Sequence, residues 1–136
     1  MKKSKSILVV LTAVLIITST GCLKRPNHPK GLGPTEVVLQ YIEYINQENA
    51  LGVQSLHTEP EKIDVVSLLK ESEFIQVSDC ICMDDDLESG LVRVRLFGEK
   101  SIINRYGREE TSKIDNVYWL QKCEDGEWRI SKWGFN

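Results

Sequence analysis

The residues in this sequence whose types suit acid–base chemistry lie far apart from one another. Asp79 is the one carboxylate that falls on the apolar face of a predicted strand, where burial would raise its pKa; a register kink or the end of the strand would instead let it reach water. His57 lies at a predicted helix boundary without an evident aspartate partner, so we expect it on the surface. The sequence shows no Ser-His-Asp set, Cys-His pair or glycine-rich phosphate loop. It therefore offers single candidates and no catalytic constellation.

Three adjacent aspartates at residues 84–86 have the composition of a calcium loop but not its spacing. An EF-hand loop requires oxygen ligands at alternate positions, a glycine at the sixth and a glutamate at the twelfth. A solvated acidic turn is the simpler interpretation. The cysteines after residue 22 would need further ligands to hold a soft metal, and no histidine stands at ligand spacing from them. We expect neither a metal nor a cofactor.

The four cysteines are Cys22, Cys80, Cys82 and Cys123. Cys80 and Cys82 lie two residues apart on one face of a predicted strand, so they are neighbours that are badly placed to bond each other. A disulfide from Cys123 to Cys80 or Cys82 is possible if the C-terminal hairpin lies beside that strand in an exported protein. The alternative is three reduced thiols packed as small apolar groups.

The first 22 residues have the three-part organisation of an export signal. Lys2, Lys3 and Lys5 precede an apolar run at residues 7–17, and small residues lead to Cys22. The apolar run is too short for a spanning helix, which needs about 20 residues. We therefore expect residues 1–21 to be a signal peptide.

The end of this segment resembles the lipobox of bacterial lipoproteins, in which a small residue precedes the cysteine that receives the lipid. Gly21 and Cys22 match the pattern, whereas Ser19 stands where the family usually has leucine. The resemblance implies a lipid on Cys22 that anchors the chain to the cell membrane, facing outside the cytoplasm. An ordinary signal cut nearby would instead give a secreted protein, and an uncleaved segment would give an N-terminal anchor.

The segment after Cys22 predicts a tether and then one small domain. Residues 22–33 have no hydrophobic periodicity and are rich in proline and glycine, as in a flexible linker. The whole chain has a net charge of −3; without its first 21 residues, 14 basic and 20 acidic residues remain, a charge of −6. A nucleic-acid partner requires a basic surface, so we expect none.

Hydrophobic spacing predicts helices in the first half of the domain at residues 34–136. Pro34 and Glu36 mark a helix start, and apolar residues then recur at three- and four-residue spacing until about Asn49. A short helix or turn at residues 50–56 and a helix over residues 58–70 follow. Tyr41 and Tyr44 either line a pocket or pack in the core.

Alternation predicts strands in the second half. One strand spans residues 74–83, with Ile81 and Met83 on its apolar face. Another spans residues 91–97, with Arg93 and Arg95 on its polar face, placed to pair with the acidic turn or with glutamates of a neighbouring element. A short strand is expected at residues 101–103.

The Asp125-Gly126 pair predicts a closing hairpin between strands at residues 117–123 and 127–135. A two-residue turn would pair Cys123 with Trp128. It would then put Trp119, Trp128 and Ile130 on one face and Tyr118, Leu120 and Trp133 on the other. Because both faces are partly apolar, the hairpin is expected at the centre of its sheet.

Residues 34–135 as a whole resemble the nuclear transport factor 2-like superfamily. The Pro-Thr-Glu helix start, the sheet-forming second half and the closing residues 119–130, with an acidic-Gly turn followed by a tryptophan, carry the resemblance. It implies an α+β cone, in which a strongly curved antiparallel sheet wraps the N-terminal helices and leaves a cavity. Candidate pocket residues are Tyr41, Tyr44, Asp79, Trp119 and Trp128.

The superfamily includes many small lipoproteins and also isomerases and dehydratases that work in the cone. No catalytic set of those enzymes carries over to this sequence. We therefore expect a membrane-anchored module of the cell envelope that binds a ligand or a protein; the alternative is a small lyase, isomerase or hydrolase using carboxylates and tyrosines of the cavity.

Overall fold

The computed structural model describes residues 28–71 and 74–135. The predicted signal peptide and Cys22 lie outside the described residues. Helices come first: α2 (Pro34–Asn46), α3 (Ala50–Ser55), the 3₁₀ turn η1 (Pro60–Lys62) and α4 (Val65–Glu71). The strands follow, with one further 3₁₀ turn: β1 (Phe74–Cys82), η2 (Leu87–Ser89), β2 (Leu91–Ile103), β3 (Glu109–Lys122) and β4 (Trp128–Phe135). None of the helices in the described ranges is long and apolar enough to cross a membrane.

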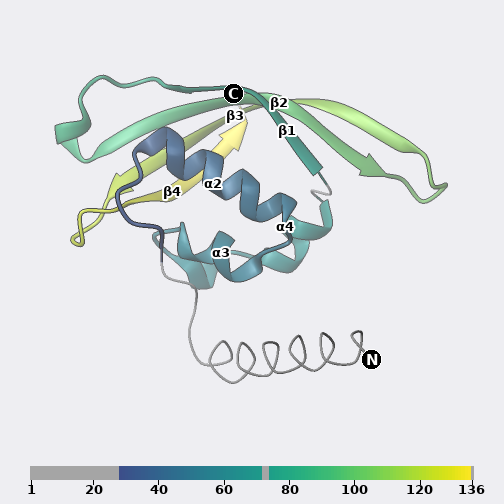
Figure 1. Cartoon of the computed structure of the whole chain (residues 1–136), viewed down its shortest axis with the longest axis horizontal. Coiled ribbons are helices and arrows are strands. Elements are labelled where there is room, and N and C mark those ends of the chain that lie inside the picture. The colour runs from purple at the N-terminus through teal and green to yellow at the C-terminus, as the bar shows by residue number, and fades with distance from the viewer. Residues whose placement is uncertain (1–27, 72–73, 136) are drawn as a thin grey trace, which may run out of the picture.

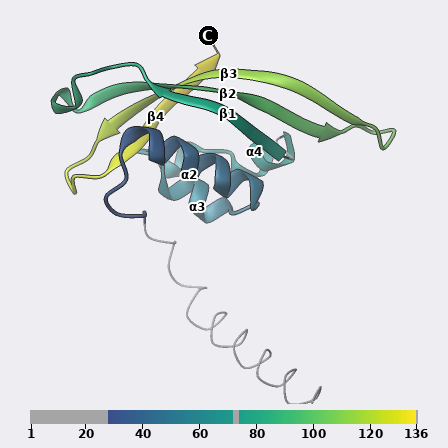
Figure 2. The ribbon, with the colours of Figure 1, turned by 45° about the horizontal axis from the view of Figure 1, so that its top comes forward.

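The four strands form one antiparallel sheet in the order β1-β2-β3-β4. Figure 1 shows this sheet curving over the helices, all of which lie on one face, and the turned view in Figure 2 shows the same two layers. None of the helices α2, α3 and α4 lies on the other face of the sheet in either view. The predicted α+β class with a curved antiparallel sheet is confirmed.

Helix α2 supplies the centre of the core. It begins at Pro34, and the carboxylate of Glu36 accepts a hydrogen bond of 3.2 Å from the Gly33 N–H, which fixes the first turn. Its buried side chains pack against β2, β3 and β4 through Val92, Val94, Leu96, Leu120 and Ile130. The helix ends at Asn46, whose side-chain amide pairs with both the N–H and the C=O of Ile75, each at 2.7 Å. Asn46 thereby covers part of the free edge of β1.

The helix expected over residues 58–70 is divided in two. η1 is a single turn, and Ile63 after it is extended, with φ −87° and ψ 115°. Asp64 then accepts hydrogen bonds from the N–H and the hydroxyl of Ser67. A side-chain oxygen that accepts a hydrogen bond from the main-chain N–H three residues later is typical of a helix N-cap. Asp64 therefore starts a separate helix, α4.

A bulge at Ser78 reverses the faces predicted for the residues that follow it in β1. Val77 pairs with Gly98 and Asp79 with Phe97, which leaves Ser78 as the extra residue. Beyond it Cys80 and Cys82 pack against the core, whereas Ile81 is 46% exposed. The prediction that Ile81 and Met83 face the core was wrong, because one inserted residue moves each later side chain to the opposite face.

The closing hairpin exists, but its predicted register was wrong by one residue. Cys123 pairs with Glu127, not with Trp128, and Lys122 lies opposite Trp128. The loop therefore has three residues and ends with Gly126 at φ +81°, a conformation that favours glycine. The shift puts Trp128 and Ile130 on the helix-covered face with Tyr118 and Leu120.

The position of the hairpin in the sheet also differs from the prediction. β4 is an edge strand, so the hairpin is not central. Only part of its free edge is covered: Leu56 C=O accepts from Ile130 N–H at 2.7 Å, and Thr58 N–H donates to Ile130 C=O at 3.0 Å. The segment after α3 thus protects β4 where it is most buried.

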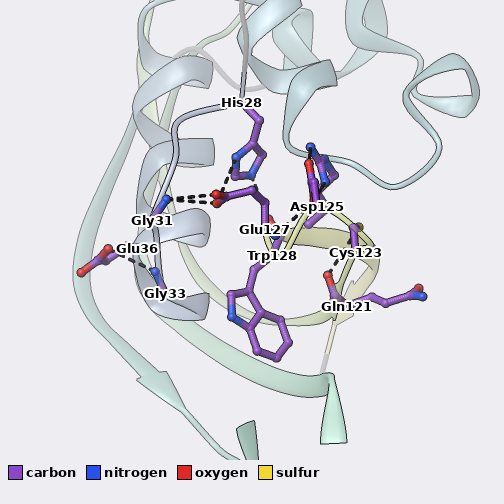
Figure 3. Close-up of polar contacts among 10 residues, drawn as sticks. His28, Gly31, Gly33, Glu36, Gln121, Cys123, Asp125, Glu127 and Trp128 are labelled. Atoms are coloured by element: carbon purple, nitrogen blue, oxygen red, sulfur yellow. Dashed lines mark hydrogen bonds and ion pairs between the residues drawn. The ribbon is translucent and has the colours of Figure 1, made fainter. Parts of the chain in front are cut away.

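Residues 28–33, the second half of the predicted tether, lie against this hairpin (Figure 3). His28 Nε2 donates to the Trp128 carbonyl at 2.8 Å, and its Nδ1 lies 3.8 Å from a Glu127 carboxylate oxygen. The same carboxylate accepts from the Gly31 N–H at 3.1 Å. We call residues 28–33 the strap, because they join the start of the described chain to its last hairpin.

Candidate functional site

Three titratable side chains meet inside the layer between the helices and the sheet. Tyr41 comes from α2, Tyr118 from β3, and His57 from the segment after α3. The Tyr41 ring packs edge-on against His57, with centroids 5.4 Å apart, and against Tyr118, with centroids 5.6 Å apart. His57 is 3% exposed, so the expectation of a surface histidine was wrong.

Burial keeps all three side chains uncharged near neutral pH. Desolvation, with a smaller contribution from Tyr118, raises the pKa of Tyr41 far above its usual range. Desolvation also raises the pKa of Tyr118 to about 12, against a hydrogen bond with Asn116 that lowers it. The pKa of His57 is lowered by desolvation, which outweighs its hydrogen bond to Val53. The rings are in direct contact, so a substrate has no room between them.

A hollow of mixed apolar and polar lining lies on the outer face of the sheet, beside one of the predicted tryptophans. It has a volume of about 400 Å³ and is bounded by the loop after β1 and the ends of β2, β3 and β4. Trp119 of β3 lies in it, and the ammonium group of Lys132 lies 4.8 Å from the centre of its ring. We call this the Trp119 hollow.

Ion pairs fix the charges around the Trp119 hollow. Asp84 accepts hydrogen bonds from the Arg93 main-chain N–H, from Nε at 3.2 Å and from Nη2 at 3.0 Å. These bonds hold the pKa of the Asp84 carboxyl below its usual range. Arg95 makes a similar paired contact with Asp115. The predicted pairing with the acidic turn is confirmed for Arg93, whereas Arg95 pairs with an aspartate of β3 and not with a glutamate. Lys132 contributes a cation that makes no ion pair with the residues that the structure describes.

The structure does not bring the five predicted pocket residues together. Tyr41 and Trp128 are core residues, and Tyr44 packs so closely on Gly52 that an added Cβ there would lie 2.7 Å from the Tyr44 ring. Asp79 is exposed and accepts a hydrogen bond from Cys80 N–H, as the register-kink alternative predicts. Of the five, only Trp119 lines the outer hollow.

The predicted disulfide is not formed, since Cys80, Cys82 and Cys123 are free thiols. Strand β2 lies between β1 and β3, so the cysteines sit two strands apart. Strands two apart are separated by roughly 10 Å, whereas bridged Cα atoms lie within about 7 Å. The prediction placed the hairpin beside β1, and the longer β2 occupies that place.

Sequence reasoning missed His57 and Tyr118 as members of one cluster. The signal that could have found His57 is its place directly after the apolar Leu56 at the end of a short helix, where the chain meets β4 in a parallel bridge to Ile130. That contact joins segments more than 70 residues apart, and no local pattern predicts it.

No protein-family model matches this sequence, and no curated protein matches it. Among solved structures, a ketosteroid isomerase-like protein from Erwinia carotovora atroseptica SCRI1043 is similar, with a TM-score of 0.52 and 12% sequence identity. The match covers 71% of this chain and 87% of that chain. At this identity the likeness shows the fold alone: the domain has a nuclear transport factor 2-like fold.

Proposed function

We propose that this chain is a lipid-anchored binding module that works outside the cytoplasm, with the Trp119 hollow as its contact region. The observation that carries the proposal is the location of open space. The aromatic rings inside the cone touch one another, whereas the outer face has an open hollow with an indole in its wall. Open concave surfaces with an aromatic wall and few polar groups are typical of binding sites.

The partner chemistry follows from the groups around the hollow. Trp119 and the exposed Leu91 offer apolar contact, and Asp84 neutralises Arg93. Lys132 adds a positive charge beside the indole. Asp86 also lines the hollow, but its carboxylate accepts hydrogen bonds from the Glu88 and Ser89 N–H groups of its own loop. We infer a peptide segment that places an apolar side chain on Trp119 and a carboxylate near Lys132, because aromatic anchors beside a charge are frequent in interfaces.

Site-specific photo-crosslinking in intact cells tests the contact region. A photoreactive amino acid at Gln121, exposed and two residues from Trp119, should give a defined cross-linked product. Trp119→Ala and Lys132→Ala should each reduce that product severalfold. Tyr106→Ala is the matched control, because Tyr106 is 72% exposed and also lies under a cation, Arg105, in the distant β2–β3 turn. A product that survives Trp119→Ala would refute the contact region.

Mass spectrometry of the N-terminal peptide tests the anchor separately. The proposal expects a peptide that begins at Cys22 and carries acyl chains, recovered from the membrane fraction. It rests on the segment at residues 1–22, whose small residues and cysteine suit lipid attachment. An unmodified mature terminus found only in the medium would refute lipid anchoring and support secretion.

The second candidate is a small isomerase, lyase or hydrolase, favoured by the buried hydroxyls of Tyr41 and Tyr118 in a fold shared with a ketosteroid isomerase-like protein. Hydroxyls kept protonated by burial can donate to a developing enolate. The described core, however, holds no buried carboxylate to act as the base. Turnover of a β,γ-unsaturated ketone that is lost in Tyr118→Phe would replace the binding proposal with this one.

A further inference from the structure

A second pocket lies at the edge of the sheet, between the segment that follows α3 and strand β4. Its volume is about 260 Å³. The residues that define its chemistry are His57, Lys62, Ile63, Ile130 and Trp133. We call it the His57 pocket; Lys132 borders both pockets, but the indole of Trp119 and the loop after β1 do not line this one.

His57 brings an unsatisfied acceptor to this pocket. Its Nδ1 lies 2.7 Å from the Val53 carbonyl, and a carbonyl only accepts, so Nδ1 carries the proton and Nε2 of the neutral ring carries a lone pair. Nε2 has no hydrogen-bond partner among the described residues and is shielded from solvent. Buried polar atoms without a partner are rare in folded proteins, because an unpaired acceptor loses its hydrogen bonds to water. Only a donor can satisfy this atom.

The rest of the His57 pocket combines apolar walls with a polar rim, which consists of Thr58, Glu59, Ser131 and two cations, Lys62 and Lys132. Ile63, Ile130 and the Trp133 indole supply the apolar surface. Lys62 reaches the rim and pairs with Glu59 at 3.0 Å, but its side chain is 68% exposed. An exposed pair of this kind contributes little energy, so Lys62 exchanges readily to another carboxylate.

We propose that the His57 pocket binds a small hydroxy acid with an apolar side chain. The hydroxyl donates to His57 Nε2, the carboxylate pairs with Lys62, and the apolar group lies against Ile63 and Trp133. The Trp133 ring packs edge-on on the imidazole with centroids 5.2 Å apart, yet Trp133 is 41% exposed. Rotation of this indole opens Nε2 to the ligand.

Three matched ligands test this proposal with the full-length chain in detergent micelles. Mandelate has the hydroxyl, the carboxylate and an apolar ring; phenylacetate lacks the hydroxyl, and mandelamide lacks the charge. The readout is the imidazole nitrogen resonances of His57, followed by NMR. Mandelate should shift Nε2 and bind about tenfold more tightly than phenylacetate, because loss of the donor leaves a buried acceptor unpaired.

Variants at the rim separate charge recognition from folding. Lys62→Ala should weaken mandelate severalfold and leave mandelamide unchanged, and Lys70→Ala, an exposed lysine of α4, should change neither. Absence of mandelate binding, equal affinities for mandelate and phenylacetate, or an unchanged Nε2 resonance would each overturn the proposal. The crosslinking at Gln121 reports on the Trp119 hollow alone, so either site can fail without the other.

Discussion

His28 Nε2 lies 2.8 Å from the main-chain oxygen of Trp128, a contact between residues 100 positions apart. With the Gly31 N–H on the Glu127 carboxylate, it fastens the strap to the closing hairpin. The strap continues directly into the segment proposed to carry the lipid. The first described residue, His28, therefore lies at the hairpin end of the sheet.

Weakening the strap should expose it to protease. His28→Ala removes a partly buried hydrogen bond, which contributes about 1 kcal/mol to the attachment of the strap. The detached form of the strap should then be about fivefold more populated, so trypsin should cleave after Lys30 about fivefold faster. Glu127→Ala should act in the same direction through Gly31. Glu124→Ala, in the exposed turn of the same hairpin, is the control. Equal cleavage rates in all four proteins would contradict a fastened strap.

Gly98 should be intolerant of any side chain, because a Cβ there would collide with the main-chain oxygen of Gln76 at the β1 bulge. Gly98→Ala should lower the free energy of unfolding by about 2 kcal/mol or more, measured by urea denaturation. Gly33→Ala is the control, because a Cβ added there meets no atom within 4 Å and the φ of Gly33 is an ordinary −74°. This substitution should lower the free energy of unfolding by about 1 kcal/mol or less. A neutral Gly98→Ala would show that β1 approaches β2 less closely.

The positions of the helices and strands were predicted more accurately from the sequence than the faces that these elements bury. Periodicity located α2, β1, the polar face of β2 and the closing hairpin, since these depend on neighbours along the chain. Two single-residue events escaped it: the bulge at Ser78 and the three-residue loop that ends at Gly126. Each depends on how two strands pair, and each moves the side chains that follow it to the opposite face. In β4 this reversal ends at the register shift after Trp119, beyond which Trp133 lies opposite Tyr118 as predicted.

The candidate sites were less predictable for a related reason. Trp119 was identified as a pocket residue, but its cation, Lys132, comes from the neighbouring strand across a second register shift, after Trp119. His57 reaches the interior through a parallel bridge to Ile130 that no local pattern encodes. A site made from several strands can be predicted only when the strand register is known, and a single sequence does not supply that register.

The three described cysteines should alkylate as free thiols with different rates. Burial, and then the charges of Asp79 and Cys82, raise the pKa of the Cys80 thiol to about 11. Because only the thiolate reacts, iodoacetamide at pH 8 should modify Cys80 at least tenfold more slowly than Cys123, as followed by peptide mass spectrometry. In denaturant without reductant all three should react. A pair that resists alkylation there would restore the disulfide prediction.

The pair of Asp125 and Arg129 should make stability depend on pH in the acid range. Two hydrogen bonds from the Arg129 guanidinium, and then the Glu127 N–H, hold the pKa of the Asp125 carboxyl well below its usual range. A carboxyl whose folded pKa is depressed stabilises the fold above its unfolded pKa, about 3.9, and this stabilisation is lost as the pH falls through the folded pKa.

Asp125→Asn keeps a side-chain oxygen for the Glu127 N–H and removes the charge, so it isolates the ion pair. The variant should have a lower urea midpoint than wild type at pH 7, and the gap should narrow steadily below pH about 4. Because Asp125 is half exposed, high salt should narrow the gap at pH 7 as well. Asp85→Asn, an exposed aspartate in the loop after β1, is the control, and a gap that stays constant between pH 7 and pH 2 would contradict the assignment of this carboxyl as the source.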